Sequence, residues 1–227
     1  MGGQACVFYG AAEFSRDLDL LVLADPGNLN RLRAALKGLG AESIGVPALD
    51  AAHLNRGHAI HFRCRREDVA GLRIDVMSSL RGVAPFEDLW ERRATIEAAS
   101  ELVDLLAIED LVRAKKTQRD KDWPMIRRLV ERDYFASENR QAPERIEFWL
   151  RELRTPELLI EAASANREAA NRIGFERPAV QAALRKNHPD VARALEEEEH
   201  EERRKDRSYW EPLKRELEEL RRQRRGP

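Results

Sequence analysis

A change in hydrophobic pattern near Pro85 most strongly limits what this chain can fold into. Before it, short apolar runs of strand length accompany one helical leucine repeat. After it, the strand signals largely disappear and helical spacing dominates. Strands are predicted over 18–23, 59–64 and 72–77, with a helix from Asn28 or Asn30 to Leu39. The pattern predicts an α/β fold with short connections, followed by a helical C-terminal region.

Helices are also predicted over 86–91, 102–119, 124–131, 143–154 and 156–172. Beyond His188 the chain is very polar. Leu213, Leu217 and Leu220 recur at i, i+4 and i+7, which is typical of one helical face. The tail is therefore expected to be an exposed helix that either needs a partner surface or frays.

Composition excludes several classes of protein. The 40 Lys and Arg residues nearly balance 41 Asp and Glu residues, so the net charge of -1 gives no overall electrostatic argument for nucleic-acid or membrane binding. No run of about 18 apolar residues occurs, and the N-terminus lacks the features of a signal peptide. We expect a cytoplasmic protein with no membrane partner. Its two cysteines, Cys6 and Cys64, are too few for a disulfide framework.

Three acidic residues lie in or beside the strand-like runs. Asp17 and Asp19 are two residues apart, so alternation along a strand places both side chains on one face of the sheet. Asp75 lies within the apolar run 72–77, where burial without a cation or hydrogen bonds is costly. Crowded carboxylates repel each other unless a cation lies between them, and Mg²⁺ prefers oxygen ligands. The three acids predict a metal site, although a solvated strand end also explains the Asp17/Asp19 pair.

Small residues precede these acids. Gly2 and Gly3 leave their backbone N–H groups open to phosphate oxygens, and Ser15 places a hydroxyl close to Asp17. A flexible N-terminus is the alternative explanation for the two glycines.

A basic segment follows the α/β region. Lys115, Arg119 and Asp122 are separated by four and three residues, so a helix would place them on one face. Such a face can meet triphosphate oxygens while the acid orients the two cations. Lys116 is an alternative to Lys115, and an ordinary solvated face with ion pairs is the competing explanation.

The order of these motifs resembles the nucleotidyltransferase superfamily. Its shared pattern is a Gly-Gly or Gly-Ser pair, then [Ser/Thr]-x-Asp-x-Asp, then a later Asp on a strand. Here Gly-Gly stands at 2–3, Ser-Arg-Asp-Leu-Asp at 15–19 and the later acid at Asp75. The block 110–122 is most similar to minimal bacterial enzymes related to abortive-infection type E toxins. The resemblance covers residues 2–132.

The resemblance implies a nucleotidyltransferase-type mixed β-sheet with flanking helices. The catalytic core would occupy 1–84, a helical part completing the active site 85–135, and a charged helical region 136–227. The implied reaction transfers NMP from an NTP to an acceptor hydroxyl and releases pyrophosphate. RNA, protein and small molecules are all open as acceptors. An antitoxin is a candidate partner, as is a second copy of the chain bound through the C-terminal helix.

The resemblance also implies roles for individual residues. Asp17, Asp19 and Asp75 would be catalytic and would hold two Mg²⁺ ions, with Mn²⁺ as an alternative. Asp75 would also accept a proton from the attacking hydroxyl. The residues implied in nucleotide binding are Gly2, Gly3, Ser15, Lys115, Lys116, Arg119 and Asp122.

Two features depart from the family pattern. Glu13 stands where members commonly have Arg, and members usually have a helix and a strand before the glycine pair. Either the start of the chain has been placed too late, or the core lacks that first helix and strand. A catalytically weak or inactive binding module that acts through its helical tail remains the alternative function.

A zinc site formed by His58 and His61 is not expected. Residues three apart in a strand point to opposite faces, so the two side chains cannot readily share one ion.

Overall fold

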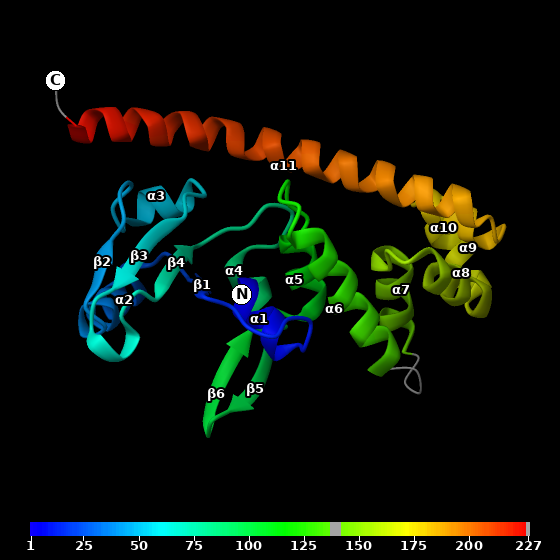
Figure 1. The fold of residues 1–227 in the computed structure, drawn as a ribbon, viewed down its shortest axis with the longest axis horizontal. Helices are drawn as coiled ribbons and strands as arrows, with labels where there is room; N and C mark the ends of the chain where they lie inside the picture. The colour runs from blue at the N-terminus through cyan, green and yellow to red at the C-terminus, as the bar shows by residue number, and fades with distance from the viewer. Residues whose placement is uncertain (137–141, 226–227) are drawn as a thin grey trace. The chain divides into compact units, whose positions relative to one another are not determined.

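A computed structural model describes residues 1–136 and 142–225 of the chain, which divides into two compact units (Figure 1). The first unit comprises Met1–Ala114 and the chain from Ser208 onward, and the second comprises Lys115–Arg207. The predicted segment 85–135 is therefore shared between the two units. The predicted mixed α/β class, with a helical C-terminal region, is confirmed.

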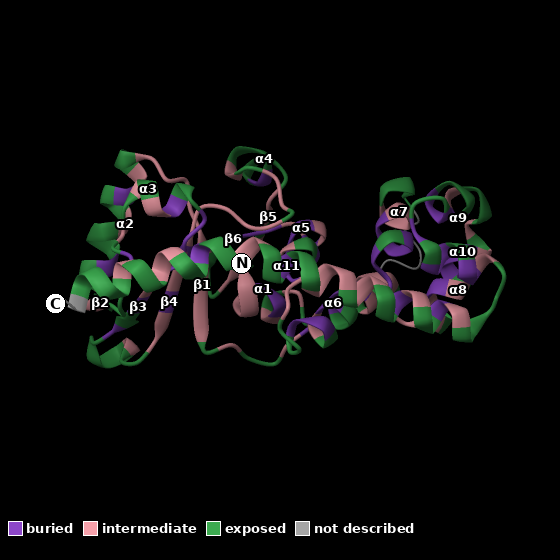
Figure 2. Cartoon of the chain, turned by 90° about the horizontal axis from the view of Figure 1, so that it is seen from above, coloured by how far each residue is buried: buried purple, intermediate pink, exposed green. Residues whose placement is uncertain are grey.

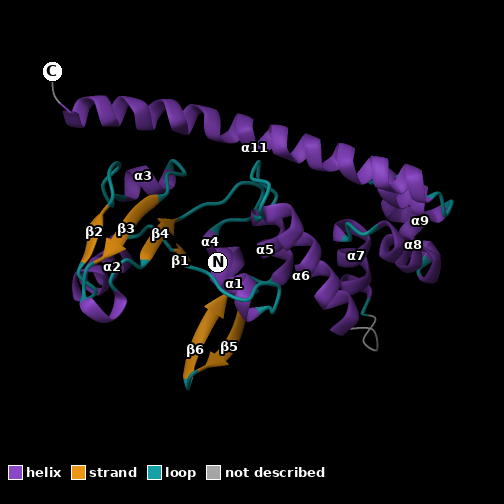
Figure 3. Cartoon of the chain, viewed as in Figure 1, coloured by secondary structure: helices purple, strands orange, loops and turns teal. Residues whose placement is uncertain are grey.

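The first unit contains a four-stranded mixed sheet in the order β1–β4–β3–β2 (Figure 3). β1 (Asp17–Leu21) runs parallel to β4 (Arg73–Met77). β3 (Ile60–Cys64) is antiparallel to both β4 and β2 (Ala41–Ser43). A short 3₁₀ turn, Glu67–Val69, connects β3 to β4. The three predicted strands are confirmed, whereas the short β2 was missed.

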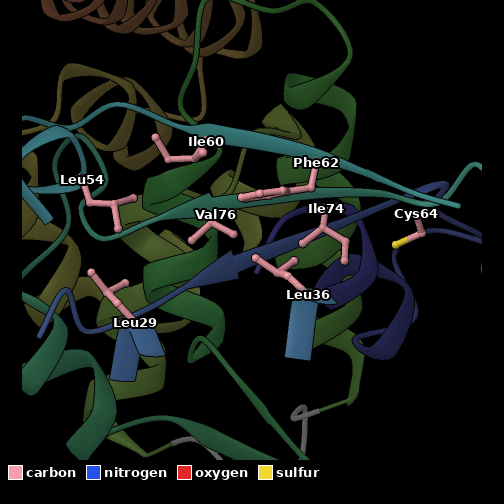
Figure 4. Packing of buried hydrophobic residues seen from close by; sticks show 8 residues of the cluster. All are labelled: Leu29, Leu36, Leu54, Ile60, Phe62, Cys64, Ile74 and Val76. Atoms are coloured by element: carbon pink, nitrogen blue, oxygen red, sulfur yellow. The ribbon is translucent and has the colours of Figure 1, made fainter. Parts of the chain in front are cut away.

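The sheet has one apolar face and one charged face, because side chains alternate along each strand. The apolar face packs with α2 (Pro26–Gly38) and α3 (Ala51–Asn55). Figure 4 shows the eight buried residues of this cluster, which are Leu29, Leu36, Leu54, Ile60, Phe62, Cys64, Ile74 and Val76. The charged residues of β1 and β4 are therefore left to the opposite face.

α2 begins earlier than the sequence analysis predicted. Asp25, and neither Asn28 nor Asn30, is the N-cap, and its Oδ1 accepts hydrogen bonds from the Gly27 N–H at 2.9 Å and the Asn28 N–H at 3.0 Å. Pro26 occupies the first turn, where its missing N–H costs no hydrogen bond.

A β-hairpin replaces the first part of the predicted helix 102–119. β5 (Ala94–Ala98) and β6 (Glu101–Leu105) pair antiparallel, and the two residues between them, Ala99 and Ser100, have φ of 50° and 66°. Turns with positive φ at both central positions usually contain Asn or Gly. This turn contains neither, so the sequence lacked the usual hairpin signal.

Three short helices complete the first unit before its C-terminal segment. α1 (Gly2–Phe8) precedes β1, and α4 (Phe86–Glu91) forms where the sequence predicts it. α5 (Ile108–Ala114) ends before Lys115, so the predicted helix to residue 119 is wrong at both ends. Buried Asp110 of α5 accepts two hydrogen bonds from the Arg92 guanidinium, at 2.6 and 3.0 Å.

The second unit is helical. Its elements are α6 (Asp122–Ala136), α7 (Pro143–Glu152), α8 (Pro156–Ala165), α9 (Arg167–Gly174), α10 (Pro178–Leu184) and the first part of α11 (His188–Arg225). The predicted helix 156–172 is interrupted at Asn166, which has non-helical φ and ψ of -125° and 54°. α10 was not predicted. Buried Arg177 donates hydrogen bonds to the carbonyl oxygens of Leu150 and Leu153 at 2.7 and 2.9 Å, and so secures the end of α7.

The C-terminal part of α11 packs within the first unit. Leu213 is buried, at 8% exposure, and Figure 2 shows how unevenly burial is distributed along this helix. Glu216 lies 2.7 Å from the Arg56 guanidinium and 2.9 Å from His58 Nε2. Arg224 donates to the Gly45 carbonyl oxygen at 2.8 Å. Leu213, the first leucine of the predicted face, therefore packs against this chain itself.

Within the described part of the chain, every helix is too short or too polar to span a lipid bilayer.

Candidate active site

The charged face of the sheet carries the three predicted acids. In the β1–β4 register, Asp19 pairs with Asp75, and Asp17 pairs with Arg73. Paired residues of parallel strands point to the same side, so the three carboxylates occupy neighbouring positions on one face. Asp17 and Asp19 are partly exposed, whereas the side chain of Asp75 is only 15% exposed.

Arg73 supplies a positive charge among these acids. Its Nε donates to Asp75 Oδ1 at 2.8 Å. That hydrogen bond raises the pKa of Arg73, and the negative charges of Asp75, Asp17 and Asp19 raise it further against the effect of burial. The guanidinium thus partly neutralises the repulsion that three carboxylates on one face would otherwise experience.

His61 of β3 also contacts Asp75. In the antiparallel register the two residues are opposite each other, and His61 Nδ1 lies 2.8 Å from Asp75 Oδ1. Burial alone would raise the pKa of Asp75, but hydrogen bonds from His61 and Arg73 outweigh burial and lower it. Asp75 is therefore ionised at neutral pH.

His61 and Arg73 were not predicted as site residues from the sequence. Arg73 had a usable signal, because it stands two residues before Asp75 in a strand and so shares its face. His61 had none, because its position opposite Asp75 depends on the pairing of β3 with β4.

Gly2 and Gly3 form the first turn of α1 and lie directly against the acids. The Gly3 N–H donates to Asp19 Oδ2 at 3.3 Å. A Cβ atom on Gly2 would lie 1.8 Å from Asp19 Oδ2, and one on Gly3 would lie 2.4 Å from Ser15 Oγ. Gly2 also has a φ of 71°, which disfavours other residues. The glycine pair is thus required for the close approach of α1 to this end of β1.

Ser15 lies two residues before the first residue of β1. Its Oγ donates a hydrogen bond to the carbonyl oxygen of Asp17 at 3.1 Å, while the Gln4 side-chain amide donates to the Ser15 carbonyl oxygen at 2.9 Å. Ser15 therefore helps to attach α1 and the start of β1 to each other.

The second predicted cluster forms around buried Asp122. Its Oδ1 lies 3.2 Å from Lys115 Nζ, and its Oδ2 accepts hydrogen bonds from Thr117 Oγ1 at 2.6 Å and Arg119 Nε at 2.8 Å. Burial would raise the pKa of Asp122, but the charge of Lys115, the Thr117 hydrogen bond and the charge of Arg119 together lower it.

The helical explanation for this cluster is wrong. Lys115 follows the end of α5 and Asp122 begins α6, so residues 115–121 form a connection between helices and share no helical face. The three residues nevertheless meet, because the connection folds back around the Asp122 carboxylate. Thr117 belongs to the cluster and was missed. Lys116 is separate from it, with Nζ 2.7 Å from Glu152 Oε2.

The two clusters belong to different units of the chain. The Asp17, Asp19 and Asp75 carboxylates lie in the first unit, and the Asp122 cluster lies in the second. Over residues 1–136 and 142–225, no group of three or more His, Cys, Asp or Glu side chains is arranged to hold a metal ion. His58 and His61 contact different carboxylates, Glu216 and Asp75.

Comparison of the chain with protein-family models, with curated proteins and with solved structures finds no match. A function for this chain can therefore be inferred only from the geometry and chemistry of its residues.

Proposed function

We propose that the protein is a metal-dependent nucleotidyltransferase, which transfers NMP from an NTP to an acceptor hydroxyl and releases pyrophosphate. The observation that carries the proposal is the placement of Asp17, Asp19 and Asp75 on neighbouring positions of one sheet face. The close packing of the Gly2-Gly3 turn against Asp19 adds support. It brings together the glycine pair and one of the acids whose order in the sequence resembles the nucleotidyltransferase superfamily.

The donor chemistry of this face suits Mg²⁺ or Mn²⁺, but the three carboxylates do not converge on one point as placed, so a bound ion would have to draw them together. Asp17, Asp19 and Asp75 offer only carboxylate oxygens, and these are ligands that hard divalent cations prefer. When bound, such ions activate the attacking hydroxyl and neutralise charge on the leaving pyrophosphate.

The lowered pKa of Asp75 favours cation binding over proton acceptance as the role of this carboxylate. A carboxylate that His61 and Arg73 keep ionised is a good ligand for a cation but a weak proton acceptor. We propose that Asp75 holds the cation and that the proton of the attacking hydroxyl passes to solvent water. The Gly3 N–H restrains the Asp19 carboxylate by its hydrogen bond to Oδ2.

A second candidate function is favoured by Arg73. Its guanidinium already pairs with Asp75 and lies in the field of Asp17 and Asp19, so a cation must compete with it. A nucleotidyltransferase-like module that binds a partner without catalysis would have no need to displace Arg73.

Label transfer from NTPs distinguishes these two functions. The full chain is incubated with Mg²⁺ or Mn²⁺, total cellular RNA and protein, and each NTP labelled at either the α- or the γ-phosphate. The proposal predicts that the α label becomes attached to an acceptor and that the γ label is released in pyrophosphate. Tight NTP binding with no transfer of the α label would support the binding module.

A further inference from the structure

The second unit contains a cavity of about 510 Å³ that the proposed function does not use. It is lined by Asp120, by the first two turns of α6, by Arg154 after α7, and by one side of α11. The lining includes none of the four residues predicted to bind nucleotide between 115 and 122, as far as the chain is described. Its volume falls within the range of about 300–1,000 Å³ that is usual for small-molecule sites.

Arg154 is the most unusual residue of this cavity. Its side chain is only 6% exposed, its Nη2 donates to the Leu195 carbonyl oxygen at 2.6 Å, and its guanidinium carbon lies 4.6 Å from the centre of the Trp123 ring. The buried Nη1 atom has no hydrogen-bond acceptor among the described residues. A buried donor without an acceptor is costly, and a bound acceptor would remove that cost.

The charge of Arg154 is incompletely balanced. Glu198 Oε1 lies 3.7 Å from Arg154 Nη1, while Glu198 Oε2 accepts a hydrogen bond from Arg177 at 3.1 Å. Burial lowers the pKa of Arg154, and the charge of Glu198 does not compensate for it. Glu198 is thus shared by two buried arginines, and the charges of Glu199 and Glu152 also favour the Arg154 cation without offsetting its burial.

The other two arginines of the cavity differ in how closely they are paired with carboxylates of the chain. Arg203 is already occupied, because its guanidinium lies 2.6 Å from Asp120 Oδ1 and 2.7 Å from Glu199 Oε1. Arg127 is half exposed, and its pair with Glu131 is long, at 3.8 Å.

The cavity adjoins the N-terminal turn of the 15-residue helix α6, where the helix dipole favours negative charge. Exposed Glu196 also lines the cavity and opposes this preference.

We propose that this cavity binds a small anionic molecule through a phosphate or carboxylate group held by Arg154 and Arg127. A small reorientation of the buried guanidinium would let Arg154 Nη1 donate the hydrogen bond that it now lacks, and Trp123 would pack against the guanidinium from the other side. A guanidinium suits either group, because its parallel N–H donors match two oxygens of one anion. The site does not depend on the proposed transferase activity.

Calorimetric titration of the full chain, without divalent metal, tests this proposal. The probes are inorganic phosphate and acetate, which distinguish a phosphate group from a carboxylate group, and 3-phosphoglycerate, which carries both groups. The proposal predicts binding of at least one probe. Arg127→Ala should weaken that binding about tenfold, since a hydrogen bond from a charged donor is lost. Arg128→Ala removes an equal charge from the same helix outside the cavity and should leave the affinity unchanged.

The Trp123 indole provides a second, local readout. Its Nε1–H donates to the Thr117 carbonyl oxygen at 2.8 Å, so its NMR resonance should shift when the cavity is filled. Arg154→Met should abolish the shift. If Arg154→Met fails to fold, the affinity of Arg127→Ala for the probes is sufficient to test the proposal. The proposal is overturned if no probe binds, or if Arg127→Ala and Arg128→Ala bind with equal affinity.

Discussion

Asp75 illustrates how neighbours on adjacent strands set the state of one carboxylate. The sequence shows an acid in an apolar strand, whose burial should favour the neutral form. The pairing of β4 with β3 adds His61, and alternation along β4 adds Arg73, so the pKa of Asp75 is lowered instead. Asp75 is therefore ionised at neutral pH, and Arg73 is its counter-charge.

Removing that internal cation should strengthen metal binding. Arg73→Ala leaves three carboxylates on one face without their counter-charge, so we expect Mn²⁺ to bind roughly tenfold more tightly. Calorimetric titration with Mn²⁺ measures this. Arg66→Ala, which removes an exposed turn arginine paired with Asp68, is the control. Equal or weaker binding by Arg73→Ala would show that Arg73 does not occupy a cation site.

Replacing Gly2 with a residue that has a side chain should destabilise the fold on steric grounds. Gly2→Ala places a methyl group 1.8 Å from Asp19 Oδ2 at a φ of 71°, and we expect it to lower the free energy of unfolding by about 1–2 kcal/mol. Chemical denaturation measures this difference. Gly38→Ala is the matched control, because a Cβ there meets nothing within 4 Å and the change should be neutral or slightly stabilising. Equal stability of the two variants would contradict the packing of α1 against Asp19.

Asp122 should make stability depend on pH in the acid range. The pKa of Asp122 in the folded chain is below the ordinary 3.8. The ionised carboxylate therefore contributes its full stabilisation of the folded chain above pH 3.8. The stabilisation is lost as the pH falls from 3.8 through the lower folded pKa. Asp122→Asn should lower stability at pH 7 by about 3 kcal/mol, because Lys115 loses its buried partner, and should flatten the acid dependence. Denaturation curves measured from pH 7 down to about pH 3 test this. An unchanged slope would exclude Asp122 as the source.

Among the elements, the β5–β6 hairpin and the 115–121 connection show where sequence periodicity misleads. The hairpin turn adopts positive φ without Asn or Gly, so nothing local separated it from the helical pattern around Leu102. The spacing of Lys115, Arg119 and Asp122 fits a helix equally well. What decides the conformation is the buried Asp122 carboxylate, which gathers donors from a folded-back connection.

The C-terminal segment of α11 should contribute to the stability of the first unit. Leu213 is 8% exposed there, and Leu213→Ala should cost about 2 kcal/mol through lost packing. Exposed Lys214→Ala should change stability by less than about 0.5 kcal/mol. Thermal or chemical denaturation of both variants measures the contrast. If Leu213→Ala abolishes self-association and leaves stability unchanged, this segment instead serves another chain.

At the scale of the whole molecule, the sequence predicted the three longer strands of the sheet and the helical second half. It also identified the acids of β1 and β4, because strand alternation is a local property. Strand order, the opposition of His61 and Asp75, and the packing of the C-terminal helix within the first unit depend on contacts distant in sequence. The cavity around Arg154 was not foreseen for the same reason.

The most direct test of the proposed function is the rate at which the α-phosphate label of an NTP reaches an acceptor. The unsubstituted chain should transfer the label, whereas Asp17→Asn and Asp19→Asn should each slow transfer by roughly 100-fold or more, because metal coordination contributes several kcal/mol. Asp68→Asn, which changes an exposed turn carboxylate, should retain the full rate. Equal rates for all four chains, or no transfer by any of them, would contradict a nucleotidyltransferase site on this sheet face.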